Sequence, residues 1–450
     1  MAGVPKGHRL GPVTDGGGGG MTATPIDPSP AARPERRPEL DAIRALVVVG
    51  LVFFHSGLVF DTRDDFYVKN AETTDATTIV AGFAVVWAMP MLFLIAGLGS
   101  WHSLRRRGAG GFAVERLLRL GVPLVFATFA LLPIAPWIRL RTDPAYHESY
   151  LEFLPRFLDV HVDVSEFPFI LQGEHFESGH LWFVVMLLVY ALLLAALFYR
   201  LPRDLGRRIR EGLATAVRRR GAVVFLPAVP IAVITALHGM EEPFAGWSRW
   251  AYLLFFLYGF VLASDERFRT AMRRDAIPAL VSALVLLAVG MPGFLVVAGS
   301  PGADPFTDMT APAIGVRLLY GAAGWCCLVA ILGLLDRRRT ARQARPDAGA
   351  SSGGGTGKRV YGYLAAAVLP LYILHQPIVV AVAYGVVRWD APIVVKYLAI
   401  VVISLTLTVI AYDLLVRRTR PTRFLFGMRG RPAPEKVRTR SGPAIQRGEL

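Results

Sequence analysis

The sequence has few cysteines and few charged residues for a chain of 450 residues. Its two cysteines, Cys326 and Cys327, are adjacent in an apolar run, so they form neither a disulfide framework nor a four-ligand zinc site. Charged residues make up 18% of the chain, against about 25% in soluble proteins. Residues 1–37 also lack the apolar core of a cleavable signal peptide, so we expect the first apolar span to direct membrane insertion itself.

Apolar runs of membrane-spanning length recur along the whole chain, and 54% of the residues are hydrophobic. This pattern predicts an all-α fold, namely a polytopic membrane bundle of about ten transmembrane helices. The predicted spans lie near 41–60, 79–101, 118–140, 180–199, 222–239, 248–264, 278–299, 313–335, 360–386 and 393–416.

The basic residues are concentrated in alternate connectors between these spans. Twenty-three Lys and Arg residues lie in connectors 102–117, 200–221, 265–277 and 336–359, whereas the connectors on the other side hold five. Because positively charged loops stay in the cytoplasm, both termini are predicted to be cytoplasmic and the protein to lie in the cell (inner) membrane. These connectors account for the formal charge of +15 without a basic face carrying aromatic residues, so we expect no nucleic-acid partner.

Composition divides the chain into three parts. Residues 1–37 are rich in Gly, Pro and charge and are predicted to form a disordered cytoplasmic tail, in which either Met1 or Met21 can be the start of translation. Residues 38–416 hold all the predicted spans and form the transmembrane domain. Residues 417–450 are basic and are predicted to form a second disordered cytoplasmic tail.

The first span carries Asp41, Arg44 and His55, three ionisable residues that are costly in hydrocarbon. Arg44 and His55 are eleven residues apart, so they share one helix face and lie about 16 Å apart along the axis. Asp41 precedes Arg44 by three residues and can pair with it at the inner surface. A polar face of this kind lines protein or a water-filled cavity. The alternatives are an Arg44 that reaches the lipid headgroups and a His55 that hydrogen-bonds to a neighbouring helix.

Arg116 and Arg119 begin the third span at its cytoplasmic end. Their spacing of three residues directs two guanidinium groups to one helix face, and guanidinium groups bind phosphate in a bidentate manner that lysine lacks. The pair is therefore a candidate phosphate site. The alternative is an ordinary pair of anchors that follows the positive-inside rule.

Two further histidines lie in predicted spans. His180 begins the fourth span, and His375 lies in the ninth span at a depth close to that of His55, with Tyr372 on the same face. If the helices bundle together, these side chains converge at middle to outer depth. A metal site is not expected there, because neither carboxylate-rich nor HxxxH spacing is present.

Four stretches, taken in order, resemble the acyltransferase type 3 membrane proteins, and within them the branch that includes the glucan biosynthesis succinyltransferase. The matching stretches are LDAIRALVVVGLVFFH, FAVERLLRLGVP, SGHLWFVVMLLVY and LPLYILHQPIVV. The resemblance implies around ten helices and transfer of an acyl group from cytoplasmic acyl-CoA to an acceptor at or beyond the outer face of the membrane.

The resemblance also implies roles for individual residues. His55 is expected to be catalytic, with a functional role for Arg44, and Arg116 and Arg119 are expected to contact the acyl donor. Asp41 joins the catalytic group through its pairing with Arg44. Acyl-CoA is the expected co-substrate, and no bound cofactor is expected.

Two mechanisms are open for His55. Neutral imidazole can take a proton from an acceptor hydroxyl, or it can attack the thioester and carry the acyl group as an acyl-imidazole. The groups expected to orient the acceptor or stabilise the oxyanion are His180, Tyr372, His375 and Glu177. The acyl group is of the acetyl or succinyl class, and the acceptor is a glycan or a similar hydroxyl compound of the cell envelope.

Two other functions are compatible with a polytopic membrane protein of this kind. In a secondary transporter the histidines would form a proton path, but the chain shows no repeat symmetry and has paired arginines at one cytoplasmic mouth. A non-catalytic assembly partner of an envelope synthase would leave His55 and His375 far apart or facing lipid.

Overall fold

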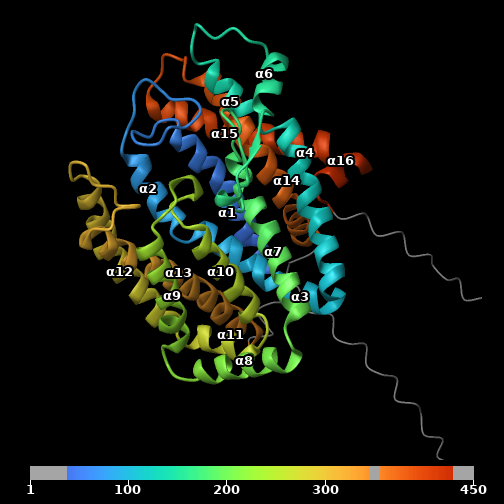
Figure 1. Cartoon of the computed structure of the whole chain (residues 1–450), viewed down its shortest axis with the longest axis vertical. Helices are drawn as coiled ribbons and strands as arrows, with labels where there is room; N and C mark the ends of the chain where they lie inside the picture. Colours follow the sequence, from blue (N-terminus) through green and yellow to red (C-terminus); the bar gives the residue numbers. More distant parts are fainter. Residues whose placement is uncertain (1–37, 345–354, 429–450) are drawn as a thin grey trace, which may run out of the picture. The chain divides into compact units, whose positions relative to one another are not determined.

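The computed structural model describes residues 38–344 and 355–428. The N-terminal tail 1–37 and most of the predicted C-terminal tail lie outside the described residues. Most of the described residues are helical, in agreement with the predicted fold class (Figure 1).

Among the described residues, the first half of the chain (38–200) forms seven α-helices and one short hairpin. Its elements are α1 (Pro38–Leu58), α2 (Ala76–Val85), α3 (Ala88–Arg116), a π-helical turn (Leu117–Gly121), α4 (Val122–Ala130), α5 (Ile134–Leu140), α6 (Tyr150–Phe157), β1 (His161–Val162), a 3₁₀ turn (Val164–Glu166), β2 (Leu171–Gln172), η3 (Gly179–Leu181) and α7 (Trp182–Arg200).

The second half is helical throughout its regular structure. Its elements are α8 (Arg203–Ala216), α9 (Ala222–His238), a 3₁₀ turn (Glu242–Phe244), α10 (Arg249–Leu262), α11 (Glu266–Arg274), α12 (Ala276–Ala298), α13 (Ala311–Gln343), α14 (Gly355–Val386), α15 (Ile393–Ala411), a π-helical turn (Tyr412–Val416) and α16 (Arg420–Leu425).

Seven helical stretches of the described residues are long and apolar enough to cross a membrane. They are Pro38–Leu58, Gly82–Leu140, Gly179–Arg200, Ala276–Ala298, Ala311–Ala341, Gly362–Val386 and Ile393–Val416. On α12, Val281, Leu284 and Val285 are each more than half exposed, which is typical of a helix that faces lipid. The predicted spans at 222–239 and 248–264 correspond to the shorter helices α9 and α10.

The stretch Gly82–Leu140 is too long for one crossing. Its 59 residues would extend about 88 Å as a straight helix, against a hydrocarbon thickness of about 30 Å. The chain turns at Gly108, whose φ of 70° is accessible to glycine at little cost. Beyond this turn Arg116 contacts Ser100, so the two arms lie side by side. The predicted connector 102–117 is therefore helical on both sides of a single glycine.

The long connector 141–179 has structure of its own. Its amphipathic segment forms α6, which begins with a capping box between Ser149 and Glu152 and buries Phe153 and Phe157 on one face. Beyond α6, β1 and β2 pair antiparallel, with His161 opposite Gln172. This hairpin, with two residues in each strand, differs from the predicted all-α class. None of its four strand residues is buried, so it does not contribute to the core.

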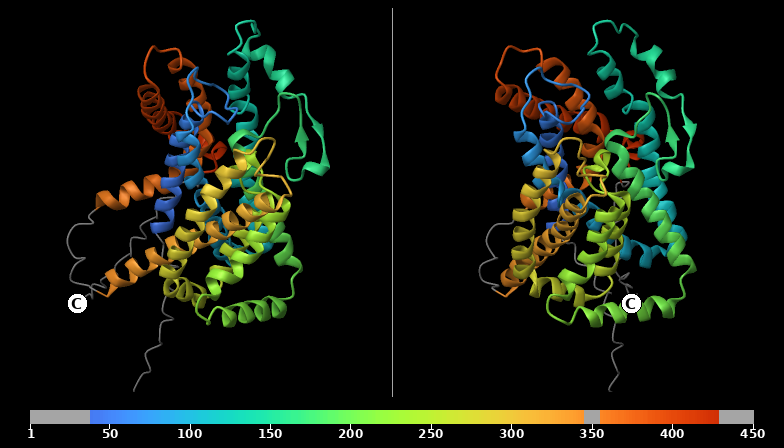
Figure 2. Two further views of the ribbon diagram at one scale, coloured as in Figure 1. Left: turned by 90° about the vertical axis from the view of Figure 1, so that its left-hand side faces the viewer. Right: turned by 60° about the vertical axis from the view of Figure 1, so that its left-hand side comes forward.

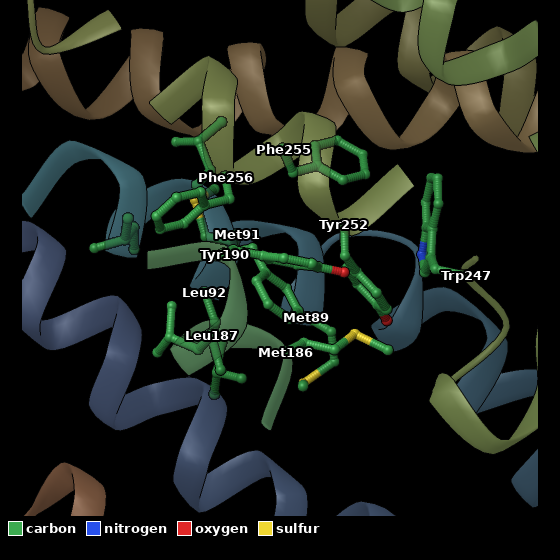
Figure 3. Close-up of a cluster of buried hydrophobic side chains, with 14 of the residues drawn as sticks. Met89, Met91, Leu92, Met186, Leu187, Tyr190, Trp247, Tyr252, Phe255 and Phe256 are labelled. Atoms are coloured by element: carbon green, nitrogen blue, oxygen red, sulfur yellow. The ribbon is translucent and has the colours of Figure 1, made fainter. Parts of the chain in front are cut away.

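The largest hydrophobic core lies where α3, α7 and α10 meet (Figure 3). Tyr252 of α10 packs against Phe93 of α3 with ring centroids 4.5 Å apart. Met89 and Met91 from α3 and Met186 from α7 fill the space around these rings, where flexible thioether chains adapt to irregular gaps.

Helix α1 packs against α14 and α15 on one side and against α3 on another (Figures 1 and 2). This position brings residues of the first span next to residues of the ninth.

The start of the predicted C-terminal tail is not disordered. Residues 420–425 form α16, Thr419 caps the helix, and Phe426 is buried against Phe126. The prediction failed here because it relied on basic composition, whereas Phe426 packs against α4 and Arg119 donates to the Gly427 carbonyl.

Candidate active site

The structure brings His55, His180 and His375 together, and we call these residues the histidine cluster. The ring centroid of His375 lies 5.2 Å from that of His55 and 5.2 Å from that of His180. Three separate elements supply them, since His55 lies on α1, His180 on η3 and His375 on α14. The predicted convergence of these side chains is therefore a feature of the fold.

A proline in α14 explains how His180 is held. Pro377 has no N–H, so the carbonyl of Ile373, four residues earlier, has no helical partner. His180 Nε2 donates a hydrogen bond to this carbonyl at 3.0 Å. Because a carbonyl only accepts, neutral His180 carries its proton on Nε2.

His375 is held in the opposite tautomer. Its Nδ1 donates to the Tyr372 carbonyl at 2.6 Å, so the Nε2 lone pair is free to accept a proton or a hydrogen bond. Among the described residues, His375 Nε2 and His55 Nδ1 are buried without a hydrogen-bond partner. Buried polar atoms are normally paired, so these two nitrogens are suited to bind a group that is not part of the chain.

Tyr372 acts differently from the sequence-based expectation. Its hydroxyl donates to the backbone carbonyl of His180, and the residue is buried. The single phenolic proton is thus engaged in holding η3 against α14, so in this arrangement it is not directed at an oxyanion.

Arginine side chains gather at the other end of α1, and we call Arg44, Arg107, Arg116 and Arg119 the arginine cluster. The Arg116 guanidinium interacts electrostatically with those of Arg119, Arg44 and Arg107. Arg116 also donates to Ser100 Oγ at 3.2 Å and lies over the ring of Phe112. Four like charges at one site favour an anionic ligand such as a phosphate group.

Glu115 and the C-terminal segment hold part of this cluster in place. Arg119 donates to Glu115 at 3.4 Å and to the carbonyl of Gly427 at 3.4 Å. Arg107 pairs with the same carboxylate at 3.1 Å.

Asp41 lies beside Arg44 at the arginine cluster, and both residues are remote from the histidine cluster. Arg44 pairs with Asp41 at 2.9 Å and donates to the Ile95 carbonyl of α3 at 3.2 Å, so it faces protein and not lipid headgroups. Eleven residues of α1 separate Arg44 from His55, or about 16 Å. This separation along α1 is the one that the sequence predicted, and the catalytic role expected for Asp41 and Arg44 stays a prediction.

The acyltransferase 3 family model, which describes an acyltransferase domain, matches residues 37–413 of the chain. The chain belongs to the acyltransferase 3 family. It is thus a multi-pass membrane acyltransferase that moves an acyl group from a donor to an acceptor. Searches of curated proteins and of solved structures found no match.

Sequence reasoning missed the segment 59–75, which lies over the histidine cluster of this acyltransferase 3 chain. Phe66 stacks on His55 with ring centroids 5.8 Å apart. Tyr67, the next residue, lies between the side chains of Glu177 and Gln376 and interacts with both. The sequence signal for this segment was two adjacent aromatic residues, Phe66 and Tyr67, in a predicted outer loop. The structure buries both side chains.

Glu177 interacts with Tyr67, and its expected role toward the acceptor stays a prediction. It precedes His180 by three residues, and burial raises the pKa of its carboxyl group, an effect that Tyr67 and Arg139 partly offset. Burial, followed by the negative charge of Glu177, raises the pKa of the Tyr67 hydroxyl well above its ordinary value. Tyr67 is therefore a neutral hydrogen-bond donor at any pH at which the protein works.

Asp64 of the same segment makes stability depend on pH. Burial raises the pKa of this carboxyl from 3.8 to about 6, although Lys69 opposes the shift. The folded state therefore holds the proton more tightly, so the stability contributed by Asp64 is present below the unfolded pKa of 3.8 and is lost as the pH rises to about 6. We expect the melting temperature of the wild type to fall over this window relative to that of Asp64→Asn, measured by thermal unfolding in detergent. Parallel curves for the two proteins would contradict this assignment.

Proposed function

We propose that the protein transfers an acetyl- or succinyl-class acyl group from cytoplasmic acyl-CoA to a hydroxyl of a glycan or similar acceptor of the cell envelope. One observation carries the proposal: α1 contributes Arg44 to the arginine cluster and His55 to the histidine cluster, about 16 Å apart along its axis. The phosphates of CoA can bind the arginines while the extended pantetheine arm places the thioester near His55. The resemblance of the four quoted stretches to the branch that includes the glucan biosynthesis succinyltransferase makes a succinyl group one candidate.

The proposed topology has ten crossings, with both termini in the cytoplasm. The turn at Gly108 divides one of the seven long stretches into two, and α9 and α10 supply the remaining two crossings. Arginines of α8 and α11 then face the cytoplasm together with the arginine cluster, in accordance with the positive-inside rule. The cell membrane is the proposed location.

In the proposed mechanism His55 is the general base. Its neutral ring takes the proton of the acceptor hydroxyl, and the hydroxyl oxygen forms a bond to the thioester carbonyl carbon. The carbon–sulfur bond then breaks, and the imidazolium returns the proton to the departing thiolate. The alternative order, in which His55 first forms an acyl-imidazole, uses the same residues and predicts a trappable acyl-histidine.

His180 and His375 support this reaction in different ways. His375 Nε2 is a free acceptor next to His55 and can take a hydrogen bond from a second hydroxyl of the acceptor. His180 is fixed by the Ile373 carbonyl and holds the outer end of the site in place.

The experiment uses the full chain in lipid nanodiscs with acetyl-CoA or succinyl-CoA and a panel of glucose oligosaccharides. We expect release of free CoA thiol and the mass of one acyl group added to an acceptor. Thiol release is measured with a thiol reagent and acyl transfer by mass spectrometry. The absence of thiol release with both donors would overturn the proposal.

A further inference from the structure

Three buried side-chain atoms lack a hydrogen-bond partner within the described residues. Two of them belong to consecutive residues of α14, and the third belongs to a residue that shares the neighbour Tyr67 with one of these. They are Glu177 Oε1, Gln376 Oε1 and His375 Nε2. All three are acceptors, since His375 carries its proton on Nδ1. Unsatisfied buried acceptors are complementary to a ligand that brings several hydrogen-bond donors.

Tyr67 connects these groups. Its side chain interacts with both Glu177 and Gln376, and a methyl group at Gly179 would lie 3.3 Å from its hydroxyl oxygen. A carboxylate only accepts, so the phenolic proton is directed at Glu177, and Gln376 must present its NH₂ group to the phenol oxygen. This orientation explains why Oε1 of Gln376 has no partner.

The segment that carries Tyr67 is held firmly. Lys69 Nζ donates to the Leu58 and Asp64 carbonyls at 2.8 and 2.9 Å. Arg139 donates to the Asp65 carbonyl at 2.5 Å, and its guanidinium lies over the Tyr67 ring at 4.8 Å. Tyr67 is therefore ordered before any ligand binds, which lowers the entropy cost of binding.

We propose that Tyr67, Glu177 and Gln376 form the part of the acceptor site that selects the acceptor, by taking hydrogen bonds from neighbouring hydroxyl groups. Glu177 and Gln376 accept from the ligand, and Tyr67 is a positioning residue that sets the orientation of both. His375 Nε2 accepts from a hydroxyl next to the one whose proton His55 takes. This inference rests on the proposed function and extends it, because it assigns Tyr67 and Gln376 and requires an acceptor with at least two adjacent hydroxyls.

The test measures binding by thermal unfolding of the full chain in detergent. The probes are methyl β-D-glucopyranoside and its tetra-O-methyl ether, which has the same ring without hydroxyl donors. The wild type is expected to be stabilised by the glucoside in a concentration-dependent way and not by the ether. Tyr67→Phe and Gln376→Met are each expected to weaken glucoside binding about tenfold, the effect of one lost hydrogen bond.

Two comparisons separate a binding role from a structural one. Both variants should retain the wild-type stabilisation by acetyl-CoA, which binds at the arginine cluster. Tyr146→Phe is the matched control, because the Tyr146 hydroxyl also donates to a glutamate of the outer connector, Glu148 at 3.0 Å, and should leave glucoside binding unchanged.

Equal stabilisation by the two probes, no response of the wild type to the glucoside, or unchanged binding in both variants would overturn the inference. Loss of acetyl-CoA binding in step with glucoside binding would also overturn it, since Tyr67 would then serve only the fold. A wild type that consumes no acyl-CoA would instead contradict the proposed function, so the two failures are distinguishable.

Discussion

Replacement of His55 with alanine is expected to reduce acyl transfer by about 10²–10⁴-fold, the usual contribution of a general acid–base residue. The ring lies 5.2 Å from that of His375 and stacks on Phe66, and its buried Nδ1 has no partner in the described part of the chain. The measurement is CoA thiol release with and without acceptor, in nanodiscs.

The matched control is His161→Ala, which removes an exposed histidine of β1 and should leave the rate unchanged. Stabilisation by acetyl-CoA should persist in His55→Ala, because the arginine cluster is about 16 Å away. Retention of full transfer by His55→Ala would remove the central residue of the proposed mechanism. A trapped acyl group on the His55 ring would favour the acyl-imidazole route over direct transfer.

Replacement of Arg116 or Arg119 with alanine is expected to raise the KM for acyl-CoA about 10–100-fold with a smaller change in kcat. Each variant loses charge-assisted hydrogen bonds, which contribute about 1.5–3 kcal/mol apiece. Arg116 is the stronger case, because its Nε is buried without a partner among the described residues and can receive a phosphate oxygen. Arg116→Lys should recover only part of the loss, since lysine lacks the planar fork.

Arg105→Ala is the control for general loss of positive charge. Arg105 lies on the arm of α3 before Gly108, and its guanidinium stacks over Trp101 at 5.3 Å, so donor affinity should be nearly unchanged. Titration of acyl-CoA at fixed acceptor concentration gives the KM for each protein. A fall in kcat without a rise in KM would place Arg116 outside the donor site. An equal rise in KM in Arg105→Ala would indicate that acyl-CoA binding depends on the total positive charge and not on Arg116 itself.

Local geometry made several parts of the site predictable. The pairing of Asp41 with Arg44, the spacing of Arg44 and His55, and the shared face of Tyr372 and His375 all follow from the period of one helix. The membrane class follows from apolar run length, because unpaired backbone groups are not tolerated in lipid. The break at Gly108 was harder to predict, because the chain continues as helix on both sides of it.

Side-chain partners across helices were not predictable in the same way. The hydroxyl of Tyr372 meets a carbonyl 192 residues away, and Arg119 meets the carbonyl of Gly427. Expectations for Tyr372 and for the disordered start of the C-terminal tail failed for this reason. One readable signal was overlooked: Pro377 frees the Ile373 carbonyl that His180 uses.

The sequence by itself determined that this chain is a helical membrane protein with basic residues at one end of its first span and a histidine about three turns away. Periodic backbone geometry is sufficient for that, because it depends on residues close together in the chain. The tertiary structure alone decided that three histidines meet, that their tautomers differ, and that Tyr67 lies against Glu177 and Gln376. Those facts depend on how distant helices pack and on non-repeating loop dihedrals, which no local pattern specifies.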